Sequence, residues 1–377
     1  MTAAPIPLHK VRAPREADAL LLDVLHSGYI ADGEQVREFE RRLGAYLGND
    51  RLVTPGGYSS ALVLCLYIAG VRPADDVVAC PDACLGTNMP ILNLFARPVW
   101  ADVDPKTGNV DPESVAAAIT PQTKAIVFAH WGGDVADLDA LRRIADERGI
   151  ALVEDASEAF GAEHRGQRLG STGSDFTVFS FGPVRHITTG EGAAIAFADA
   201  EAAERARWLK RYGIHQPTFR DALGEIDPAS DIPEPGLDSY LNNLAAAIGI
   251  AQLESADEVV ARHRANGRFY DEALAGVPGI DLIQRRSDSV SGYWVYTLLA
   301  EERDALMAHL KDRGIGCSRL HLRNDLYSAF GDGPADLPGV REFSARRLCI
   351  PCGWWVGDED RERIVREIDG WARRSAR

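Results

Sequence analysis

Several side chains that can carry chemistry follow a short apolar run near the middle of this 377-residue chain. The run Phe176–Phe179 is rich in aromatic and β-branched residues and predicts a buried strand, and Ser180 stands where that strand ends. Arg185 and His186 come next, and a Gly-rich turn then leads to a second predicted strand, Ala193–Phe197. An arginine keeps its positive charge, whereas a histidine can act as a base near neutral pH. Because α/β proteins bind ligands where strands end, we expect a binding site here.

Two carboxylates end another apolar run. Ala151–Val153 leads directly into Glu154 and Asp155. A buried acid is costly unless it has a cationic partner, so this pair at the carboxyl end of a strand predicts a site for a cationic group. The alternative is that the acids cap a following helix, and that alternative fits Glu154 better than Asp155.

A third segment, Arg51–Leu62, has the pattern of a strand, a glycine turn and a helix start. Ser59 and Ser60 are favoured N-cap residues, and we expect them to begin an apolar helix over Ala61–Ala69. The N-terminus of a helix offers free N–H groups and the positive end of the dipole, so it binds phosphate readily. The segment by itself does not distinguish a phosphate site from an ordinary helix start.

The composition excludes several classes of protein. The formal net charge of −15 argues against nucleic acid and anionic membranes as partners. The sequence has no apolar run as long as a membrane span and no signal-peptide pattern, so we expect a cytoplasmic protein. Its six cysteines are too few and too scattered for a disulfide framework. Cys349 and Cys352 have no second metal-ligand pair beside them, and no metal site is predicted.

Hydrophobic spacing predicts the elements that position these groups. Residues 17–47 contain two helical patterns, and Asp137–Gly149 predicts an amphipathic helix that ends at its glycine. Leu244–Leu253 predicts an apolar helix at an interface, and residues 214–235 predict a loop. The alternation of strands and helices is typical of an α/β fold.

Three stretches together resemble the sugar aminotransferase (DegT/StrS) family. The sequence FTVFSFGPVRHITTGEGAA is similar to the family pattern SF-x-x-x-K-x-x-T-T-G-E-G-G, and EDASEAFGA and AAIGIAQL match two further motifs. The resemblance extends over about residues 5–375. It implies fold type I, with a mainly parallel sheet in a large domain (1–254, including N-terminal helices) and a smaller C-terminal α+β domain (255–377). It also implies a pyridoxal or pyridoxamine phosphate cofactor and a homodimer whose sites are shared between subunits.

The resemblance assigns roles to four of the polar side chains. Asp155 falls where the family pairs an acid with the ring nitrogen of the cofactor. Glu158 falls near the ring hydroxyl. The stretch Gly57–Leu62 aligns with the family's SGT-A-AL phosphate loop, which puts Ser59 at the phosphate-binding threonine, and Ser180 completes the expected cradle.

Three positions depart from the family pattern. Arg185 replaces the lysine that forms the Schiff base, and an arginine is not a usable nucleophile. Leu85 stands where an aromatic residue stacks on the cofactor ring, so stacking is lost. Asp238 replaces the asparagine that reaches the phosphate of the neighbouring subunit, where a carboxylate would be repelled.

One branch of the family, the 3-dehydratases, also lacks the lysine and uses loosely held pyridoxamine phosphate with a histidine base. That branch has HHIT where this chain has Arg185 followed by His186, Ile187 and Thr188. The catalytic first histidine is therefore absent. His186 remains a candidate base, although in a family-like loop its side chain should point away from the ring.

Two readings follow from these residues. We favour an enzyme of amino-sugar, deoxysugar or aminocyclitol biosynthesis, including antibiotic pathways, that acts on a keto- or amino-sugar with a non-covalently held cofactor. The alternative is a cofactor-free relative, either a partner subunit of an active paralogue or an independent catalyst, in which Arg185 pairs with Asp238 of the partner subunit. Four further side chains have open roles. His321 and Arg323 fit the active site and a solvated surface equally, a core role for Tyr29 is at least as good as a substrate contact, and His130 at a strand end fits a structural role better.

Overall fold

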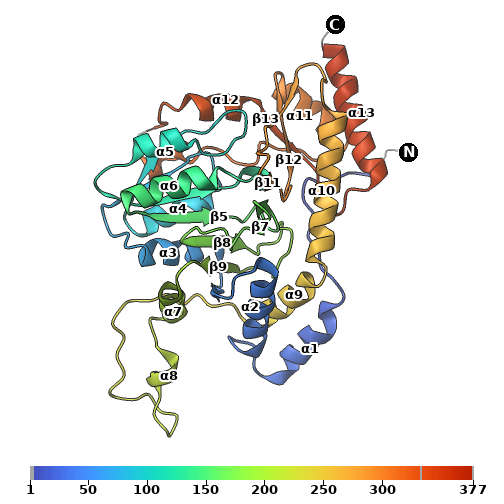
Figure 1. Cartoon of the computed structure of the whole chain (residues 1–377). Helices are drawn as coiled ribbons and strands as arrows, with labels where there is room; N and C mark the ends of the chain where they lie inside the picture. The colour runs from blue at the N-terminus through green and yellow to red at the C-terminus, as the bar shows by residue number, and fades with distance from the viewer. Residues whose placement is uncertain (1–3, 332, 376–377) are drawn as a thin grey trace.

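A seven-stranded sheet forms the centre of the computed structural model, which describes residues 4–331 and 333–375 (Figure 1). Its strands are β1 Leu52–Val53, β2 Asp76–Ala79, β3 Arg97–Trp100, β4 Thr123–Ala129, β5 Ala151–Asp155, β8 Phe176–Ser180 and β9 Ala193–Phe197. Their order is β1-β9-β8-β5-β4-β2-β3. Only β9 is antiparallel to its neighbours β8 and β1, whereas the other pairs in this sheet are parallel. The predicted α/β fold with a mainly parallel sheet is confirmed.

Helices cover both faces of this sheet because successive strand residues point to opposite sides. Val78 and Ile126 belong to the core under one set of helices, and their neighbours Val77 and Val127 belong to the core under the other. The first face carries α5 Pro112–Ala118 and α6 Leu138–Arg148, and the second carries α3 Tyr58–Ile68, α4 Leu85–Asn93 and α7 Ala200–Leu209. The result is a three-layer arrangement with its strand ends open for a site.

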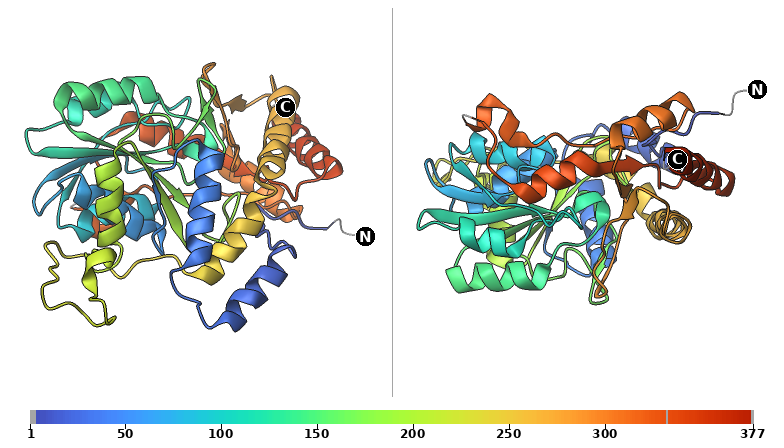
Figure 2. Two further views of the ribbon diagram at one scale, coloured as in Figure 1. Left: turned by 60° about the horizontal axis from the view of Figure 1, so that its bottom comes forward. Right: turned by 90° about the horizontal axis from the view of Figure 1, so that it is seen from above.

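A smaller three-stranded sheet lies beside the large one. It consists of β10 Ile280–Leu282, β12 Tyr296–Ala300 and β13 Arg347–Ile350, in the order β10-β12-β13. Three helices pack with it: α10 Ala256–Ala273, α11 Arg303–Asp312 and α13 Asp358–Ser375. Figure 2 shows α10 and α13 side by side. The N-terminal segment joins this part of the molecule, because Ile6 bridges to Ile315. The division of the chain at residue 254 stays a prediction.

Short elements connect the two sheets. Strands β6 Glu163–His164, β7 Gln167–Arg168 and β11 Ser289–Val290 form a third sheet in the order β11-β6-β7. In this sheet Val290 of β11 pairs with Glu163 of β6. This pairing joins a strand that follows α10 in the chain to the segment that follows β5. The remaining helix of this half is α12 Pro338–Arg346.

The apolar helix predicted at an interface packs against two N-terminal helices of its own chain. This helix, α9 Asn243–Leu253, lies against α1 Ala17–Ser27 and α2 Glu34–Leu47, as Figure 1 shows. Its residues Ala246, Ala247 and Ile250 are buried without any second subunit. Burial within the chain and burial between chains require the same apolar pattern, so the interface role of this helix stays a prediction.

Two details near the predicted loops also differ from expectation. Helix α3 begins at Tyr58, earlier than predicted, with Gly57 as its N-cap and no side-chain cap. Ser60 therefore does not cap the helix, and its hydroxyl donates to the carbonyl of Gly57 over 2.8 Å. The predicted loop 214–235 contains one short helix, α8 Gln216–Phe219, and extends away from the body of the molecule (Figure 1).

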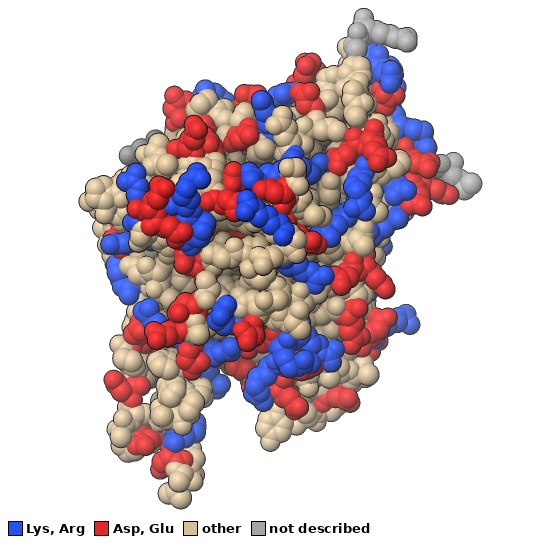
Figure 3. Space-filling view, in the orientation of Figure 1, with Lys and Arg blue, Asp and Glu red and all other residues tan. Residues whose placement is uncertain are grey.

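The visible face of the molecule carries both signs of charge. Figure 3 shows acidic and basic side chains interspersed over the helices of this face, with no broad basic expanse. Among the described residues, no helix is both long enough and apolar enough to cross a membrane.

Candidate functional site

A small cavity lies at the carboxyl ends of β4 and β5, where the sequence predicted a site. Its wall includes Asp155, the last residue of β5, and Glu158 from the loop that follows. Arg185 from the β8–β9 loop and His321 from a loop of the C-terminal part complete the polar wall. The cavity volume is about 20 Å³, which is room for roughly one water molecule.

Asp155 already has hydrogen-bond partners from its own chain. Its Oδ2 atom accepts from the hydroxyl of Tyr58 and lies 2.9 Å from Oγ1 of Thr87. Its Oδ1 atom accepts from the backbone N–H of Ser157 over 3.0 Å. The buried carboxylate thus has three hydrogen-bond donors within its own chain, and the cationic partner that the sequence led us to expect stays a prediction.

Tyr58 is the residue that sequence reasoning missed. It is the first residue of α3, and its ring packs against Gly86 in the first turn of α4. Desolvation and the neighbouring Asp155 carboxylate raise the pKa of its phenol well above the ordinary value. The signal was present in the sequence, because the phosphate-loop alignment places Tyr58 on the glycine of the family motif.

Arg185 occupies the other side of the cavity, and its side chain is only 10% exposed. Its Nη1 atom lies 3.7 Å from Oε1 of Glu158, and its guanidinium carbon lies 4.6 Å from the ring centre of Trp294. His9 stacks on the same indole at 4.7 Å. Burial and the nearby Arg185 charge lower the pKa of His9 to about 4. The guanidinium is therefore held by a carboxylate and an aromatic ring of its own chain.

Glu158 links Arg185 to His321. Its Oε1 atom lies 2.9 Å from Nε2 of His321, and its Oε2 atom accepts from the N–H of Gly132 over 2.9 Å. Burial raises the pKa of Glu158, but the His321 hydrogen bond and the Arg185 charge outweigh burial, and the pKa lies below its usual value. An ionised Glu158 can only accept, so Nε2 of His321 carries the proton and Nδ1 is left as a possible base.

Other predicted site residues lie outside this cavity. The ring of His186 is buried, its Nε2 atom hydrogen-bonds the carbonyl of Gly292 over 2.8 Å, and it does not line the cavity. Ser180 is buried and accepts from the N–H of Gly182 over 3.3 Å. Two further predicted residues, Ser59 and Leu85, are exposed on the first turns of α3 and α4.

Asp238 lies in a separate hollow of about 750 Å³ at the start of α3. Gly57 and Ser60 line the same hollow, and Tyr212 lies near the Asp238 carboxylate, which raises the pKa of its phenol. Within one chain the structure therefore does not bring Asp238 and Arg185 together. Their pairing across two subunits stays a prediction.

The side chains whose roles the sequence left open divide into two groups. His321 lines the cavity, whereas His130 is buried and bonds Glu154 over 2.9 Å. Arg323 forms an ion pair with Asp325 in its own loop. Tyr29 is 81% exposed and so is not a core aromatic of this chain.

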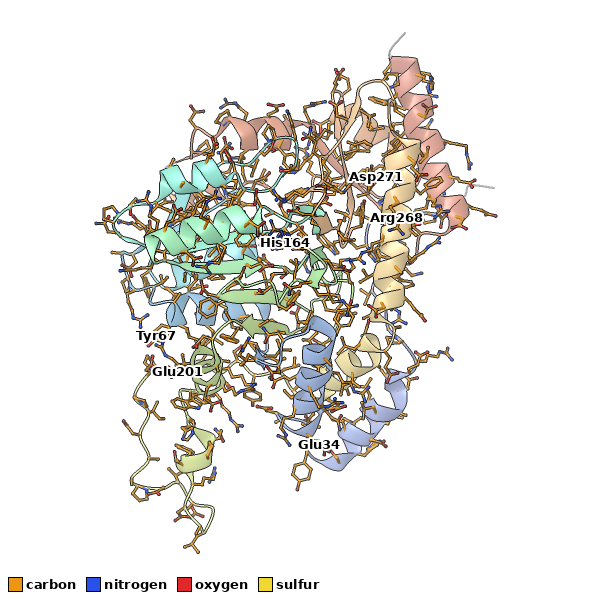
Figure 4. The ribbon with its side chains drawn as sticks, viewed as in Figure 1. Glu34, Tyr67, His164, Glu201, Arg268 and Asp271 are labelled. Carbon is orange, nitrogen blue, oxygen red and sulfur yellow. The ribbon has the colours of Figure 1, made fainter. Side chains whose placement is uncertain are left out.

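A possible metal cluster elsewhere does not make a convincing site. Asp139, His164 and Asp288 have ligand atoms within 4.8 Å of one another, and Figure 4 labels His164 on its strand. Arg165 pairs with Asp139 at 2.5 Å, and Arg286 pairs with Asp288 at 2.9 Å. Because these two cations already neutralise the carboxylates, we assign no metal to the cluster.

The residues at the cavity do not fit a pyridoxal group in this arrangement. Asp155, the acid that the family resemblance pairs with a pyridinium, is bonded to Tyr58, and the permanently charged Arg185 stands where that resemblance expects a lysine. A cavity of about 20 Å³ is far below the several hundred Å³ of typical small-molecule pockets.

Comparisons with known proteins identify the relatives of the chain. The sequence profile of the DegT/DnrJ/EryC1/StrS aminotransferase family matches residues 13–369. The spore coat polysaccharide biosynthesis protein SpsC of Bacillus subtilis is 29% identical over 357 residues, 92% of each chain. The sugar aminotransferase CalS13 of Micromonospora echinospora is 36% identical, with a TM-score of 0.92 over 97% of this chain and 99% of its own. DesV of S. venezuelae, solved with a ketimine intermediate, is 31% identical, with a TM-score of 0.90 over 98% and 99%.

Proposed function

The chain belongs to the DegT/DnrJ/EryC1/StrS aminotransferase family and has its fold type I architecture, and from this premise we propose that it serves amino-sugar, deoxysugar or aminocyclitol biosynthesis without lysine-dependent transamination. The family is pyridoxal-phosphate-dependent, and its solved relatives include sugar aminotransferases. The observation that carries the proposal is Arg185 at the lysine position, inside the cavity with Asp155 and Glu158.

No other lysine takes over the missing role. The chain has five lysines, and none of them is among the residues that line the cavity. The buried one, Lys210, directs its Nζ atom at the carbonyl of Thr54 over 3.4 Å and lies 3.8 Å from Glu40. An imine with a cofactor aldehyde therefore has no amine at the cavity to form it.

Of the two readings that the sequence left open, the geometry favours the cofactor-free one. A non-covalent cofactor would depend on Asp155 for its ring, and Tyr58 holds that carboxylate. We therefore propose a cofactor-free protein whose ligand is a keto- or amino-sugar or a related cyclitol.

The groups that remain can transfer a proton. Glu158 orients His321, so Nδ1 of His321 is a general base, and Arg185 can stabilise negative charge that develops on a neighbouring oxygen. These are the roles needed to remove a proton from the carbon beside a sugar ketone. The carbon–hydrogen bond breaks, the proton goes to His321, and the electron pair moves to the carbonyl oxygen.

A second candidate function is that of a partner subunit for an active paralogue. The small cavity favours it, because a sugar cannot enter unless the loop that bears His321 moves away. Assembly of subunits is itself a proposal. It is supported by exposed apolar side chains in two places. Leu22 and Leu25 lie on α1 with Tyr29 just after it, and Leu223 and Ile226 lie on the extended 213–236 segment.

The test uses a nucleoside-diphosphate keto-hexose with the wild-type protein in deuterated water. We expect deuterium to enter beside the ketone, and we expect the His321→Asn variant to lose this exchange while still unfolding at the wild-type temperature. Added glutamate and pyridoxal phosphate should yield no amino-sugar, and formation of one would overturn the proposal. Failure of the sugar to exchange would favour the partner-subunit function, which co-purification with a lysine-bearing paralogue then tests.

A further inference from the structure

Tyr58 lies beside the space next to Asp155 where the family resemblance places the cofactor ring. We call this space the ring region. The Tyr58 hydroxyl contacts two side chains of the cavity wall. It donates a hydrogen bond to Oδ2 of Asp155 and lies 2.8 Å from Oγ1 of Thr87. Each carboxylate oxygen has two acceptor positions, so two hydroxyls saturate Oδ2. The acid that the family resemblance assigns to the cofactor ring therefore has no free position on this oxygen.

A second, independent observation shows that the chain is shaped for this tyrosine. A Cβ atom on Gly86 would lie 2.8 Å from Cε1 and 3.1 Å from Cδ1 of Tyr58. Both contacts are tighter than ordinary packing allows, so only glycine leaves room for the ring. Gly86 lies inside α4, where glycine destabilises a helix by about 0.5–1 kcal/mol relative to alanine. The pair is complementary in shape as well as in hydrogen bonding.

The same arrangement explains why Asp155 persists without a cation. A buried carboxylate with no partner is strongly destabilising. Here Tyr58, Thr87 and the N–H of Ser157 supply its hydrogen bonds. Asp155 thus has a structural role, and its presence is not a sign of a retained pyridinium.

We propose that Tyr58, seated on Gly86 and bonded to Asp155, closes the ring region and excludes both pyridoxal and pyridoxamine phosphate. The inference rests on the proposed function in treating the chain as a cofactor-free relative, and goes beyond it by naming the excluding residue. It follows that replacing Arg185 by lysine is not sufficient to restore a covalent cofactor. Tyr58 must be removed as well.

The test compares three variants under pyridoxal phosphate titration: Arg185→Lys alone, Tyr58→Ala/Arg185→Lys, and Tyr58→Phe/Arg185→Lys. The phenylalanine variant is the matched control because it fills the same space without the hydroxyl. After borohydride reduction and mass spectrometry, we expect a pyridoxyl adduct on the lysine introduced at position 185 only in the alanine double variant. Equal labelling of the single Arg185→Lys variant would overturn the inference, and so would full labelling of the phenylalanine double variant.

Two further measurements distinguish loss of folding from failure of the proposed exclusion of the cofactor by Tyr58. Thermal unfolding of each variant identifies loss of structure, and the Tyr58→Ala single variant provides a second readout. We expect that variant to bind pyridoxamine phosphate at least tenfold more tightly than wild type, and equal affinity would contradict the inference. Non-covalent cofactor binding by wild type would overturn the exclusion but leave the absence of lysine-dependent transamination standing. A pyridoxyl adduct on a wild-type lysine would instead overturn the proposed function.

Discussion

Two hollows near the start of α3 differ in what fills them. The one bounded by Asp155, Thr87 and Arg185 has about 20 Å³ of free volume, and side chains of the same chain close it. The other, lined by Gly57, Ser60 and Asp238, is open and has about 750 Å³. The closed hollow is where the family resemblance places the cofactor ring, and the open one is where the phosphate loop begins. The comparison shows that side chains of this chain fill the first hollow, whereas the second is open and has the Asp238 carboxylate in its wall.

Removing the central acid of the closed hollow should have the largest effect. Asp155→Ala leaves the hydroxyls of Tyr58 and Thr87 without their acceptor, and hydrogen bonds to a charged group are worth about 1.5–3 kcal/mol. We expect the free energy of unfolding in urea to fall by about 3 kcal/mol. The matched change in the open hollow, Asp238→Ala, should stay within about 0.5 kcal/mol. Equal losses would remove the distinction between the hollows, and a large loss for Asp238 alone would indicate a buried partner such as Arg185 of the partner subunit.

His9, which stacks on Trp294 beside Arg185, should make the free energy of unfolding depend on pH. Its pKa is about 4 in the folded chain but near 6.5 when unfolded, so the unfolded state binds more protons between these values. Stability is therefore fully present above pH ~6.5 and falls as the pH drops towards ~4, by on the order of 2–3 kcal/mol. The His9→Phe variant keeps a ring on Trp294 and should reduce the slope of this part of the urea-measured pH profile, while His186 and His263, whose pKa values burial also lowers, continue to contribute to it. An unchanged slope would show that the imidazole of His9 is not desolvated.

A cycle of variants at Gly86 sharpens the claim of shape complementarity. Gly86→Ala places a methyl group against the Tyr58 ring and should cost about 2 kcal/mol, as overpacking commonly does. In the Tyr58→Ala background the same change should stabilise the protein by about 0.5–1 kcal/mol, because alanine is the better helix residue. Thermal and urea unfolding of the four proteins measure the cycle. The same sign in both backgrounds would contradict the pairing of Tyr58 with Gly86.

The smallest of these effects isolates one hydroxyl. Tyr58→Phe keeps the ring but removes the donor to Asp155, and we expect a loss of about 1.5 kcal/mol in urea unfolding. Tyr212→Phe is the control, because its hydroxyl also lies near a carboxylate, Asp238, but the residue is 50% exposed. That change should stay within about 0.5 kcal/mol. An equal loss in the free energy of unfolding for Tyr58→Phe and Tyr212→Phe would mean that burial does not strengthen the Tyr58 hydrogen bond.

The fold was predictable from the sequence because the residues within each short stretch determine whether it forms a strand or a turn. The apolar run that ends at Ser180 and the run that ends at Asp155 both form strands at the predicted positions, and both place polar groups at the sheet edge. Local pattern does not specify what a buried surface packs against. For that reason the apolar pattern of α9 did not predict its packing against α1 and α2, and its expected place at a subunit interface stays a prediction.

The site was predictable only in part, for the same reason. Asp155, Glu158 and Arg185 come together as their strand ends imply, whereas His186 turns away within its loop. Tyr58 escaped notice because its role depends on Gly86, a contact that no single motif contains. A tyrosine at a glycine position of a phosphate loop was the one local sign of it.

The most direct test of the central claim is a calorimetric titration of the wild-type protein with pyridoxamine phosphate, which needs no lysine to bind. If Tyr58 and Arg185 close the ring region, no binding heat should appear at about 1 mM ligand, which limits the binding free energy to less than ~4 kcal/mol. Saturable binding at one site per chain, lost in an Asp155→Asn variant that still folds, would show that Asp155 meets a cofactor ring and would contradict the account.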